Sequence, residues 1–333
     1  MSERQGNTVE GNERHCLLVS AETKGSVTRK RHNLRVVGRP LRRVPVSAFR
    51  SHHRRLSWYP PRAMSSLDRS SPDPAPAPEY DSFAEIYSIW TDSAVAASAN
   101  LPFYVDAYLA ADGPVVELGV GDGRIAVEAA NRGGVLTGVD QSSVMLERCR
   151  KRAGRAGVLD HLTLIKADFR DFDLPKPAGL IVLPYHSIGH LATLARKGEA
   201  LRHIFSRLRP GGHFVFDDFF MTPALMAHMR KVQLRATYQS ASGLDRLLWV
   251  TSLLDEPTQT ISVVTWEDQL DGVGVLEQRR YRRLSLSWLE PGQAQALLEE
   301  TGFTVEACLG DFQRTPFDPT SALEQVWIAR KPA

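Results

Sequence analysis

The sequence predicts an α/β protein with a Rossmann-like, mostly parallel sheet of seven strands and helices on both faces. Between residues 80 and 218, short apolar strand candidates alternate with helical stretches, an order typical of parallel sheets. After residue 218 the strand candidates alternate apolar with polar residues. This second pattern predicts an antiparallel β-meander, solvated on one face and inserted before the last elements of the sheet.

Each element is predicted from its own pattern. Apolar residues at helical spacing predict an amphipathic helix over residues 80–90, and further helices are expected at 101–110, 124–130, 143–156, 192–207 and 291–301. Strands of the main sheet are expected at 114–118, 135–139, 162–166, 179–183, 213–217, 303–308 and 322–329. Turn signals separate the expected meander strands at 232–239, 246–254, 260–268 and 275–286.

Charge divides the chain into a tail and a body. Residues 1–63 have a net charge of +10 and no sustained periodicity, whereas the remaining residues have a net charge of −7. We expect residues 1–79 to be a disordered basic tail with a Pro-rich linker, and residues 80–330 to form one domain with an insert at about 221–290. The tail fits three interpretations: an arm for RNA or anionic surfaces, a transit peptide, or a functionless extension before a start at Met64. The acidic body is not expected to bind nucleic acid.

The apolar runs and the cysteines predict where in the cell the protein occurs. No apolar run reaches the roughly 18–20 residues of a membrane helix, so no membrane partner is expected. Cys16, Cys149 and Cys308 lie far apart and lack the spacing of zinc ligands. They argue against a disulfide framework and predict a reducing, cytoplasmic compartment.

A glycine-rich turn follows the first strand of the sheet. Residues 117–123 read ELGVGDG, and glycines there permit a tight turn and a ligand lying against the backbone. The GxGxG spacing differs from the GxGxxG of dinucleotide folds. The acids Glu117 and Asp122 would repel a phosphate but suit a ligand that carries a sulfonium and an ammonium group. The turn therefore disfavours an NAD(P) oxidoreductase.

Acidic residues also follow the next two strands. Asp140 lies 21 residues after Gly119 and can accept hydrogen bonds from both ribose hydroxyls. Asp168 and Phe169 can bond an adenine amino group and cover the ring. Each feature alone is equally a turn or a helix cap. Their order at successive strand ends favours a nucleoside cofactor.

These motifs resemble a known family. Residues 116–124, 138–140 and 167–169 resemble the first three motifs of class I S-adenosylmethionine-dependent methyltransferases, and residues 208–216 resemble that family's turn before a strand. The resemblance covers about residues 80–330 and implies S-adenosylmethionine as the cofactor. It implies Gly119 and Gly121 beside the methionine portion, Asp140 on the ribose, Gln141 and Phe169 flanking adenine, Asp168 on its amino group, the Leu183 carbonyl on the methionine ammonium, and Tyr87 and Trp90 closing the site.

The loop after residue 183 is the expected catalytic loop. It places Tyr185, His186 and His190 close to the transferred methyl group. Imidazole suits base catalysis near neutral pH, so His186 is the first candidate to deprotonate a hydroxyl acceptor, followed by His190 and then Tyr185. An amine acceptor needs little or no base. Both histidines also fit loop or packing roles.

Two adjacent acids, Asp217 and Asp218, raise the alternative of a magnesium site. The pattern lacks a further oxygen ligand, so no metal is expected.

A second resemblance concerns the acceptor. Residues 187–190 together with the meander resemble bacterial amino-sugar N,N-dimethyltransferases, whose extra strands build a substrate roof and often a dimer contact. Four aromatic residues of the insert fit this role, or that of a sheet core: Tyr238, Trp249, Trp266 and Tyr281. The resemblance implies a homodimer through the inserted sheet. We predict methyl transfer to a nitrogen or oxygen of a small molecule, with an NAD(P)-binding oxidoreductase or a non-catalytic scaffold of the same fold as alternatives.

Overall fold

The computed structural model describes residues 78–333 except residues 94 and 241. The expectations for the basic tail lie outside the described residues. The helices are α1 Pro78–Ala84, α2 Tyr87–Asp92, α3 Val95–Ala110, α4 Arg124–Asn131, α5 Ser143–Ala156, α6 Leu194–Arg207, α7 Pro223–Met229 and α8 Pro291–Thr301. Short 3-10 helices are η2 Leu159–His161 and η3 Ser187–His190. Within this part of the chain, no helix is both long and apolar enough to cross a membrane.

The main sheet has seven strands in the order β10-β11-β5-β4-β1-β2-β3. These are β1 Val115–Leu118, β2 Leu136–Asp140, β3 Leu162–Lys166, β4 Ala178–Leu183, β5 Leu208–Phe219, β10 Thr304–Leu309 and β11 Glu324–Arg330. The pairs from β5 to β3 are parallel, and β11 is antiparallel to both of its neighbours. The carboxyl ends of β1, β2, β3, β4 and β5 therefore meet at one edge, where ligands of such sheets bind.

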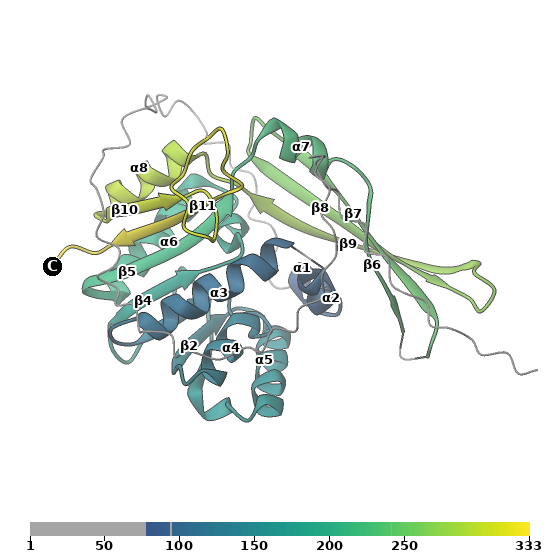
Figure 1. The fold of residues 1–333 in the computed structure, drawn as a ribbon, viewed down its shortest axis with the longest axis horizontal. Helices are drawn as coiled ribbons and strands as arrows, with labels where there is room; N and C mark the ends of the chain where they lie inside the picture. The colour runs from purple at the N-terminus through teal and green to yellow at the C-terminus, as the bar shows by residue number, and fades with distance from the viewer. Residues whose placement is uncertain (1–77, 94, 241) are drawn as a thin grey trace, which may run out of the picture. The chain divides into compact units, whose positions relative to one another are not determined.

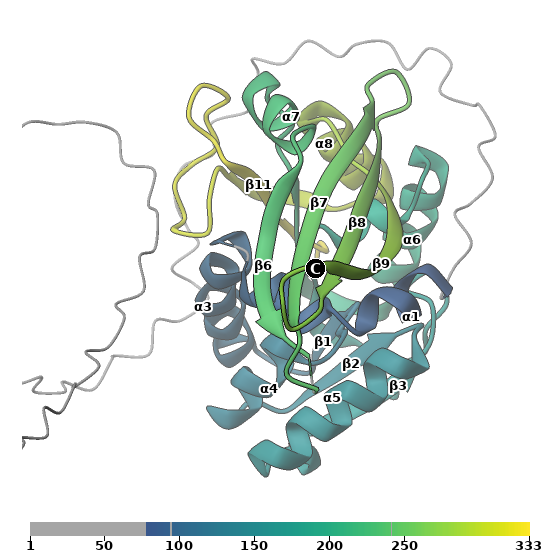
Figure 2. The same ribbon diagram turned by 90° about the vertical axis from the view of Figure 1, so that its right-hand side faces the viewer.

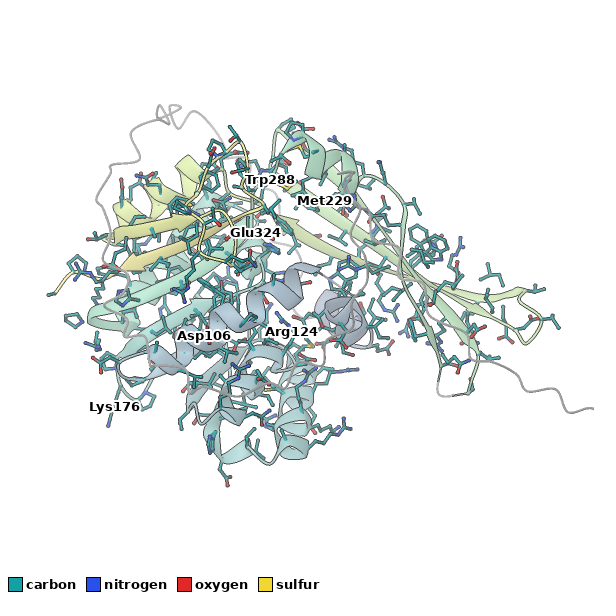
Figure 3. The ribbon with its side chains drawn as sticks, in the orientation of Figure 1. Asp106, Arg124, Lys176, Met229, Trp288 and Glu324 are labelled. Carbon is teal, nitrogen blue, oxygen red and sulfur yellow. The ribbon has the colours of Figure 1, made fainter. Side chains whose placement is uncertain are left out.

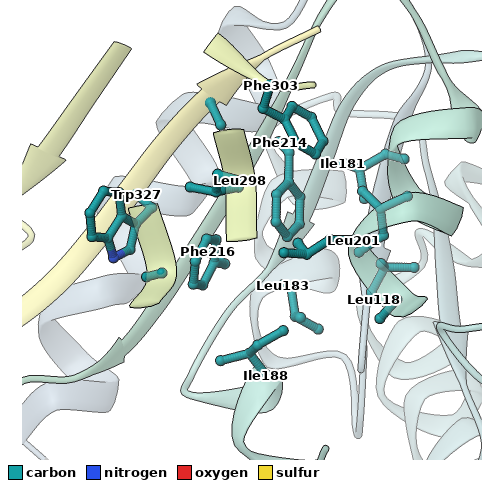
Figure 4. Packing of buried hydrophobic residues seen from close by; sticks show 14 of the residues in the cluster. Leu118, Ile181, Leu183, Ile188, Leu201, Phe214, Phe216, Leu298, Phe303 and Trp327 are labelled. Carbon is teal, nitrogen blue, oxygen red and sulfur yellow. The ribbon is translucent and has the colours of Figure 1, made fainter. Parts of the chain in front are cut away.

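Helices cover the sheet on both faces (Figure 1). On one face, α3, α4 and α5 pack on the sheet through a cluster that includes Tyr104, Ile125 and Leu146. On the other face, α6 and α8 contribute Leu201 and Leu298 to a second cluster, in which they lie against the sheet side chains (Figure 4). These clusters confirm the predicted α/β fold.

The inserted sheet is a four-stranded antiparallel meander in the order β6-β7-β8-β9 (Figure 2). Its strands are β6 Gln233–Gln239, β7 Asp245–Asp255, β8 Thr260–Leu270 and β9 Leu276–Ser287. The inner face buries Leu248 against Phe83 and Ile86, and buries Val250, Ile261 and Val263 in a cluster that includes residues of α7. The predicted insert is thus confirmed as a second sheet packed on α1, α2 and α7.

The structure differs from the local predictions at several places. The helix expected over residues 80–90 is two helices, because the chain turns at residues 85–86 and buries Phe83 and Ile86 together against the meander. Helix α7 was not predicted, although Thr222 caps it by accepting a hydrogen bond from the Leu225 amide and Pro223 begins it. Strand β5 begins five residues earlier than expected, since Leu208 already pairs with β4.

The four aromatic residues of the insert divide between its two faces. The Tyr238 hydroxyl donates to the inward-facing Glu267 carboxylate. Trp249, Trp266 and Tyr281 are directly paired on adjacent strands and form a row on the opposite face, with ring centroids 6.2 and 6.0 Å apart. Tyr281 is 61% exposed. These three residues are therefore a surface row and not part of the sheet core.

Candidate active site

The glycine turn after β1 has the backbone that its sequence predicts. Gly119, Gly121 and Gly123 all have positive φ, at 67°, 56° and 79°. A Cβ at Gly123 would lie 2.5 Å from the Cys149 sulfur on α5, so this position is restricted by packing. A Cβ at Gly121 would lie 3.4 Å from Met145 and 3.7 Å from the Tyr87 hydroxyl. The turn is therefore bare backbone with Tyr87 beside it.

Asp140 connects the ends of β1 and β2. Its buried carboxylate accepts hydrogen bonds from the amides of Gly121 at 2.9 Å and Ser142 at 2.8 Å. Burial raises the pKa of Asp140, and these two amides oppose the rise. Each oxygen keeps a lone pair beyond these bonds, so the side chain can still accept from a ribose. The half-buried Gln141 follows directly.

The two acids of the glycine turn are buried and incompletely satisfied. Among the described residues, Oε2 of Glu117 and Oδ1 of Asp122 have no hydrogen-bond partner. Burial raises the pKa of Glu117 to about 8, although Tyr108 and Arg124 act to lower it. Burial also raises the pKa of Asp122, whose other oxygen accepts from Arg152. Buried acceptors without partners are costly, and a cationic ligand would relieve them.

The loop after β3 brings Asp168 and Phe169 next to this edge. The Ala167 amide donates to the Asp140 carbonyl at 3.1 Å, which joins the two loops. Both oxygens of Asp168 already accept from Arg170, at distances of 2.7–3.0 Å. Burial raises the pKa of Asp168, but these bonds outweigh it and the net shift is downward. Arg170 therefore competes for the carboxylate predicted to bind adenine. Phe169 packs against the cluster that contains Leu201 and Leu298.

Helix α2 lies over the glycine turn and supplies Tyr87 and Trp90. Trp90 packs edge-on against Phe83, with ring centroids 5.4 Å apart. The guanidinium carbon of Arg235, on β6, lies 4.7 Å from the centre of the Trp90 ring. The helix is thus placed between the turn and the inserted sheet, as the predicted closing element requires.

The loop after β4 is fixed by a single buried carboxylate. Leu183 ends the strand fully buried, and Tyr185 and His186 then take positive φ values of 60° and 56°. Asp217 on β5 accepts from the amides of both residues at 2.9 Å and from the Tyr104 hydroxyl at 2.5 Å. These bonds offset the strain of a left-handed backbone at two residues that are not glycine.

His186 is held as a cation rather than as a free base. Its Nε2 lies 2.9 Å from the Glu324 carboxylate, and its ring stacks on Phe219 at 3.7 Å. Burial lowers the pKa of His186, but the carboxylates of Glu324, Asp217 and Asp218 raise it more, to about 9. At neutral pH the imidazole is therefore protonated and cannot accept a proton. This geometry opposes the predicted base role and favours a positioning role.

His190 has the opposite environment. Burial and the nearby Lys197 lower the pKa of His190 to about 4. The Lys197 ammonium is itself buried, and it donates to the carbonyls of Ile188 and Leu191 and to the Ser287 hydroxyl. This lysine ties η3 to β9. His190 is therefore neutral but only weakly basic.

The glycine turn and the β4 loop lie together. A Cβ at Gly119 would be 3.2 Å from the Ser187 hydroxyl, and the Arg124 guanidinium lies 5.6 Å from the Tyr185 ring centre. The structure thus brings the predicted residues of α2, β1, β2 and β4 to one edge of the sheet.

Sequence reasoning missed two contributors to this edge, Arg124 and Glu324, and the role of a third, Asp217. Arg124, directly after the glycine turn, was identifiable as a cation placed beside the acids. Asp217 was identifiable as a strand-end acid, but its role as a hydrogen-bond acceptor depends on β4 lying next to β5. Glu324 is 138 residues from His186 and carries no local signal. Figure 3 labels Arg124 and Glu324 on the side of the main sheet toward the insert.

The carboxylates of Asp217 and Asp218 accept hydrogen bonds from different backbone amides. The Asp218 oxygens accept from the amides of Phe219 and Leu289, both at 2.8 Å. Burial raises the pKa of Asp218 to about 7. No group of three or more metal-binding side chains occurs among the residues described between 78 and 333.

Comparison with known proteins finds a similar family over the part of the chain that contains the glycine turn and the β4 loop. Residues 115–212 match a family model described as a methyltransferase domain. The tRNA 5-carboxymethoxyuridine methyltransferase of Escherichia coli K12 is 32% identical over 114 residues, which are 32% of this chain and 42% of that protein. The chain spans less than half the length of the curated relatives it matches.

Solved structures resemble the chain over both sheets. The CcbJ methyltransferase from Streptomyces caelestis has a TM-score of 0.63 at 23% identity, covering 75% of this chain and 96% of that one. The sugar N-methyltransferase KedS8 from Streptoalloteichus sp. ATCC 53650 has a TM-score of 0.58 at 18% identity, covering 81% and 99%. At these identities the likeness concerns the fold, and it confirms the predicted architecture with its insert.

Proposed function

We propose that the chain transfers a methyl group from S-adenosylmethionine to a nitrogen of a small molecule. The match of residues 115–212 to a methyltransferase domain model supports the methyl-transfer part of this proposal. The observation that carries the cofactor part is the unpartnered, buried Glu117 oxygen beside a turn of three left-handed glycines. An acidic, bare turn fits a ligand with ammonium and sulfonium charges.

The residues present fit the cofactor group by group. When bound, S-adenosylmethionine supplies an electrophilic methyl carbon. The glycine turn accommodates the methionine portion, Glu117 offers an acceptor to positive charge, and Arg124 offers a guanidinium to the methionine carboxylate. Asp140 would accept from the ribose hydroxyls, and Tyr87 and Trp90 would exclude water from the methionine end. Gln141 and Phe169 would flank adenine, and the Leu183 carbonyl would accept from the ammonium. Asp168 would bind the adenine amino group only through lone pairs that Arg170 leaves free.

The acid–base state of the β4 loop supports the choice of nitrogen over oxygen as the acceptor atom. His186 is cationic near neutral pH because its pKa is raised to about 9, and His190 is a weak base because its pKa is lowered to about 4. A hydroxyl acceptor generally needs an efficient base, whereas a neutral amine brings its own lone pair. The chain then contributes alignment and water exclusion. The sugar N-methyltransferase among the structures of similar fold supports this assignment.

A mass-spectrometric screen tests the proposal. Full-length protein and cofactor are incubated with matched amines and alcohols, including amino sugars and their hydroxyl analogues, and with bulk tRNA. We expect methylation of amines and none of the matched alcohols or tRNA. Methylation of an alcohol or of tRNA would overturn the assignment of a small-molecule nitrogen as the acceptor. Cofactor binding by calorimetry without turnover on any acceptor would instead favour the non-catalytic scaffold, and tighter binding of NAD would favour the oxidoreductase.

Asp140→Ala is the control for cofactor specificity in this screen. Loss of charge-assisted hydrogen bonds to the ribose weakens cofactor binding by about 1.5–3 kcal/mol. An unchanged affinity measured by calorimetry would remove Asp140 from the cofactor site.

The outer face of the insert is proposed as a homodimer contact. Leu234 pairs with Trp249 in the same cross-strand row as Trp266 and Tyr281, which makes one apolar stripe across all four strands. Leu234 is 48% and Tyr281 is 61% exposed. Contiguous exposed apolar residues of this kind mark contact surfaces. Sedimentation of wild-type protein and the Tyr281→Glu variant tests this: a dimer that the variant dissociates supports the contact, and a wild-type monomer rejects it.

A further inference from the structure

Arg235 lies at an irregularity in strand β6. Leu234 pairs with Trp249 and Ala236 pairs with Leu248, so the register shifts at the residue between them. Leu234 is exposed, whereas Ala236 packs in the inner cluster with Phe83 and Leu248. Bulges of this kind redirect a side chain and occur frequently beside active sites. Here the redirected side chain is an arginine on the edge strand next to α2.

Arg235 has no carboxylate partner in the described part of the chain, which sets it apart from the other arginines of the inner face. Arg246 pairs with Glu267, Arg280 with Glu85, and Arg282 with both of these acids. Among the described residues, the buried Nε of Arg235 has no hydrogen-bond partner. Its Nη2 donates to the Trp90 carbonyl at 3.5 Å. Burial lowers its pKa, as expected for a guanidinium without a counter-ion.

The position of Arg235 places this charge at the candidate active site. Its guanidinium lies over the Trp90 ring at 4.7 Å. It also acts electrostatically on Tyr185, the first residue of the β4 loop with left-handed backbone. Arg124 acts on the same tyrosine from the glycine turn. Tyr185 is therefore influenced by two guanidiniums, one from the residue after the glycine turn and one from β6 of the insert.

We propose that Arg235 binds an anionic oxygen group, a carboxylate or a phosphate, of the methyl acceptor. A guanidinium presents a rigid fork of donors that matches both groups, and stacking on Trp90 keeps that fork oriented. Its location on the insert, the element proposed as the acceptor roof, assigns it to the acceptor, while Arg124 serves the cofactor carboxylate. This inference rests on the proposed function for the identity of the acceptor.

Anion binding tests the site without methyl transfer. Full-length protein saturated with S-adenosylhomocysteine is titrated with inorganic phosphate and, separately, acetate, and binding is followed by ligand-observed NMR. We expect saturable binding that Arg235→Met weakens by about 10–100-fold and Arg235→Lys partly restores. The control Arg283→Met removes one charge from an exposed position on the opposite face of the same sheet and leaves binding unchanged. Equal binding by wild type and Arg235→Met, or none by wild type, overturns the proposal.

Two further measurements identify the source of the anion. If Arg235 held the cofactor instead, Arg235→Met would weaken binding of S-adenosylhomocysteine, and this result rejects the acceptor role. With an amine found in the screen, the acidic compound and its neutral amide are compared: we expect KM for the acidic compound to rise about 10–100-fold in Arg235→Met and KM for the amide to stay constant. An equal rise for both compounds overturns the proposal. Failure of methyl transfer with anion binding retained rejects the proposed function alone.

Discussion

The turn after β1 and the loop after β4 use left-handed backbone in opposite ways. In the first, three glycines take positive φ, and two buried acid oxygens have no hydrogen-bond partner among the described residues. In the second, Tyr185 and His186 take positive φ, and the amide of each donates to Asp217. The glycine turn thus presents buried acceptors that a ligand could use, whereas the amides of Tyr185 and His186 are already satisfied by Asp217. The difference separates a binding surface from a scaffold that holds the reacting groups.

Removing the scaffold's carboxylate has the largest expected effect. Asp217→Ala leaves the Tyr104 hydroxyl and two strained amides without their acceptor in a fully buried position. We expect a loss of about 3–5 kcal/mol in the free energy of unfolding, measured by urea denaturation. Asp311→Ala is the matched control, because Asp311 also accepts from two amides but near the surface. If both variants lose the same free energy of unfolding, the buried contacts of Asp217 stabilise the β4 loop no more than surface contacts do.

Filling the binding surface comes second. Gly121→Val adds a branched side chain beside Met145 and Tyr87 at a φ of 56°. We expect S-adenosylhomocysteine to bind at least about 100-fold more weakly in calorimetry, because side-chain volume and about 1–3 kcal/mol of strain act together. Gly157→Val imposes similar strain at a φ of 71° in open space at the end of α5. A similar loss of affinity in the control would show that strain alone, and not occupied space, explains the effect.

The charge state of His186 gives a smaller effect on rate. Because the raised pKa keeps it protonated, His186→Gln is expected to lower kcat by less than about tenfold, below the usual contribution of a general base. The wild-type rate should show no titration near pH 6.5. A loss of 10²-fold or more, with a wild-type titration near pH 6.5 that disappears in the variant, would restore His186 as the base.

The raised pKa of His186 also predicts a pH-dependent contribution to the stability of the folded protein. A pKa raised from 6.5 to about 9 in the folded protein stabilises it fully below pH 6.5. That stabilisation falls as pH rises through 9. The difference in unfolding free energy between wild type and His186→Gln should follow this course.

The comparison also explains what the sequence revealed. The strands, α5 and α8 and the glycine turn were predictable because each depends on local periodicity, caps or backbone requirements. The environment of the β4 loop depends on Asp217 and Glu324, which reach His186 only through strand order. A histidine's pKa follows its neighbours, so its role was not readable from residues 183–190 alone. Likewise, the lack of a carboxylate partner for Arg235 in the described part of the chain appears only once the partners of the other arginines are known.

The smallest expected effect is a proton count at the glycine turn. Glu117 has its pKa raised to about 8 by burial, so its carboxyl is mostly protonated at pH 7 in the free protein. A bound sulfonium and ammonium would stabilise the carboxylate and lower that pKa, so binding should release up to about one proton. S-adenosylhomocysteine lacks the sulfonium charge and should release fewer protons. Calorimetry in buffers of different ionisation enthalpy measures these numbers.

The pH dependence of binding and a Glu117 variant decide whether Glu117 is the source of the released proton. If the bound form needs the carboxylate, affinity for S-adenosylmethionine rises with pH up to about 8 and then levels off. Glu117→Gln should lose this rise and the proton release that accompanies it, because an amide has no proton to give up. Asp122 also has a raised pKa and lies in the same turn, so Asp122→Asn is the matched control that keeps most of the release. Proton release that persists in Glu117→Gln and disappears in Asp122→Asn would overturn this assignment. Asp122, which already pairs with Arg152 of α5, would then be the acceptor for the cationic ligand.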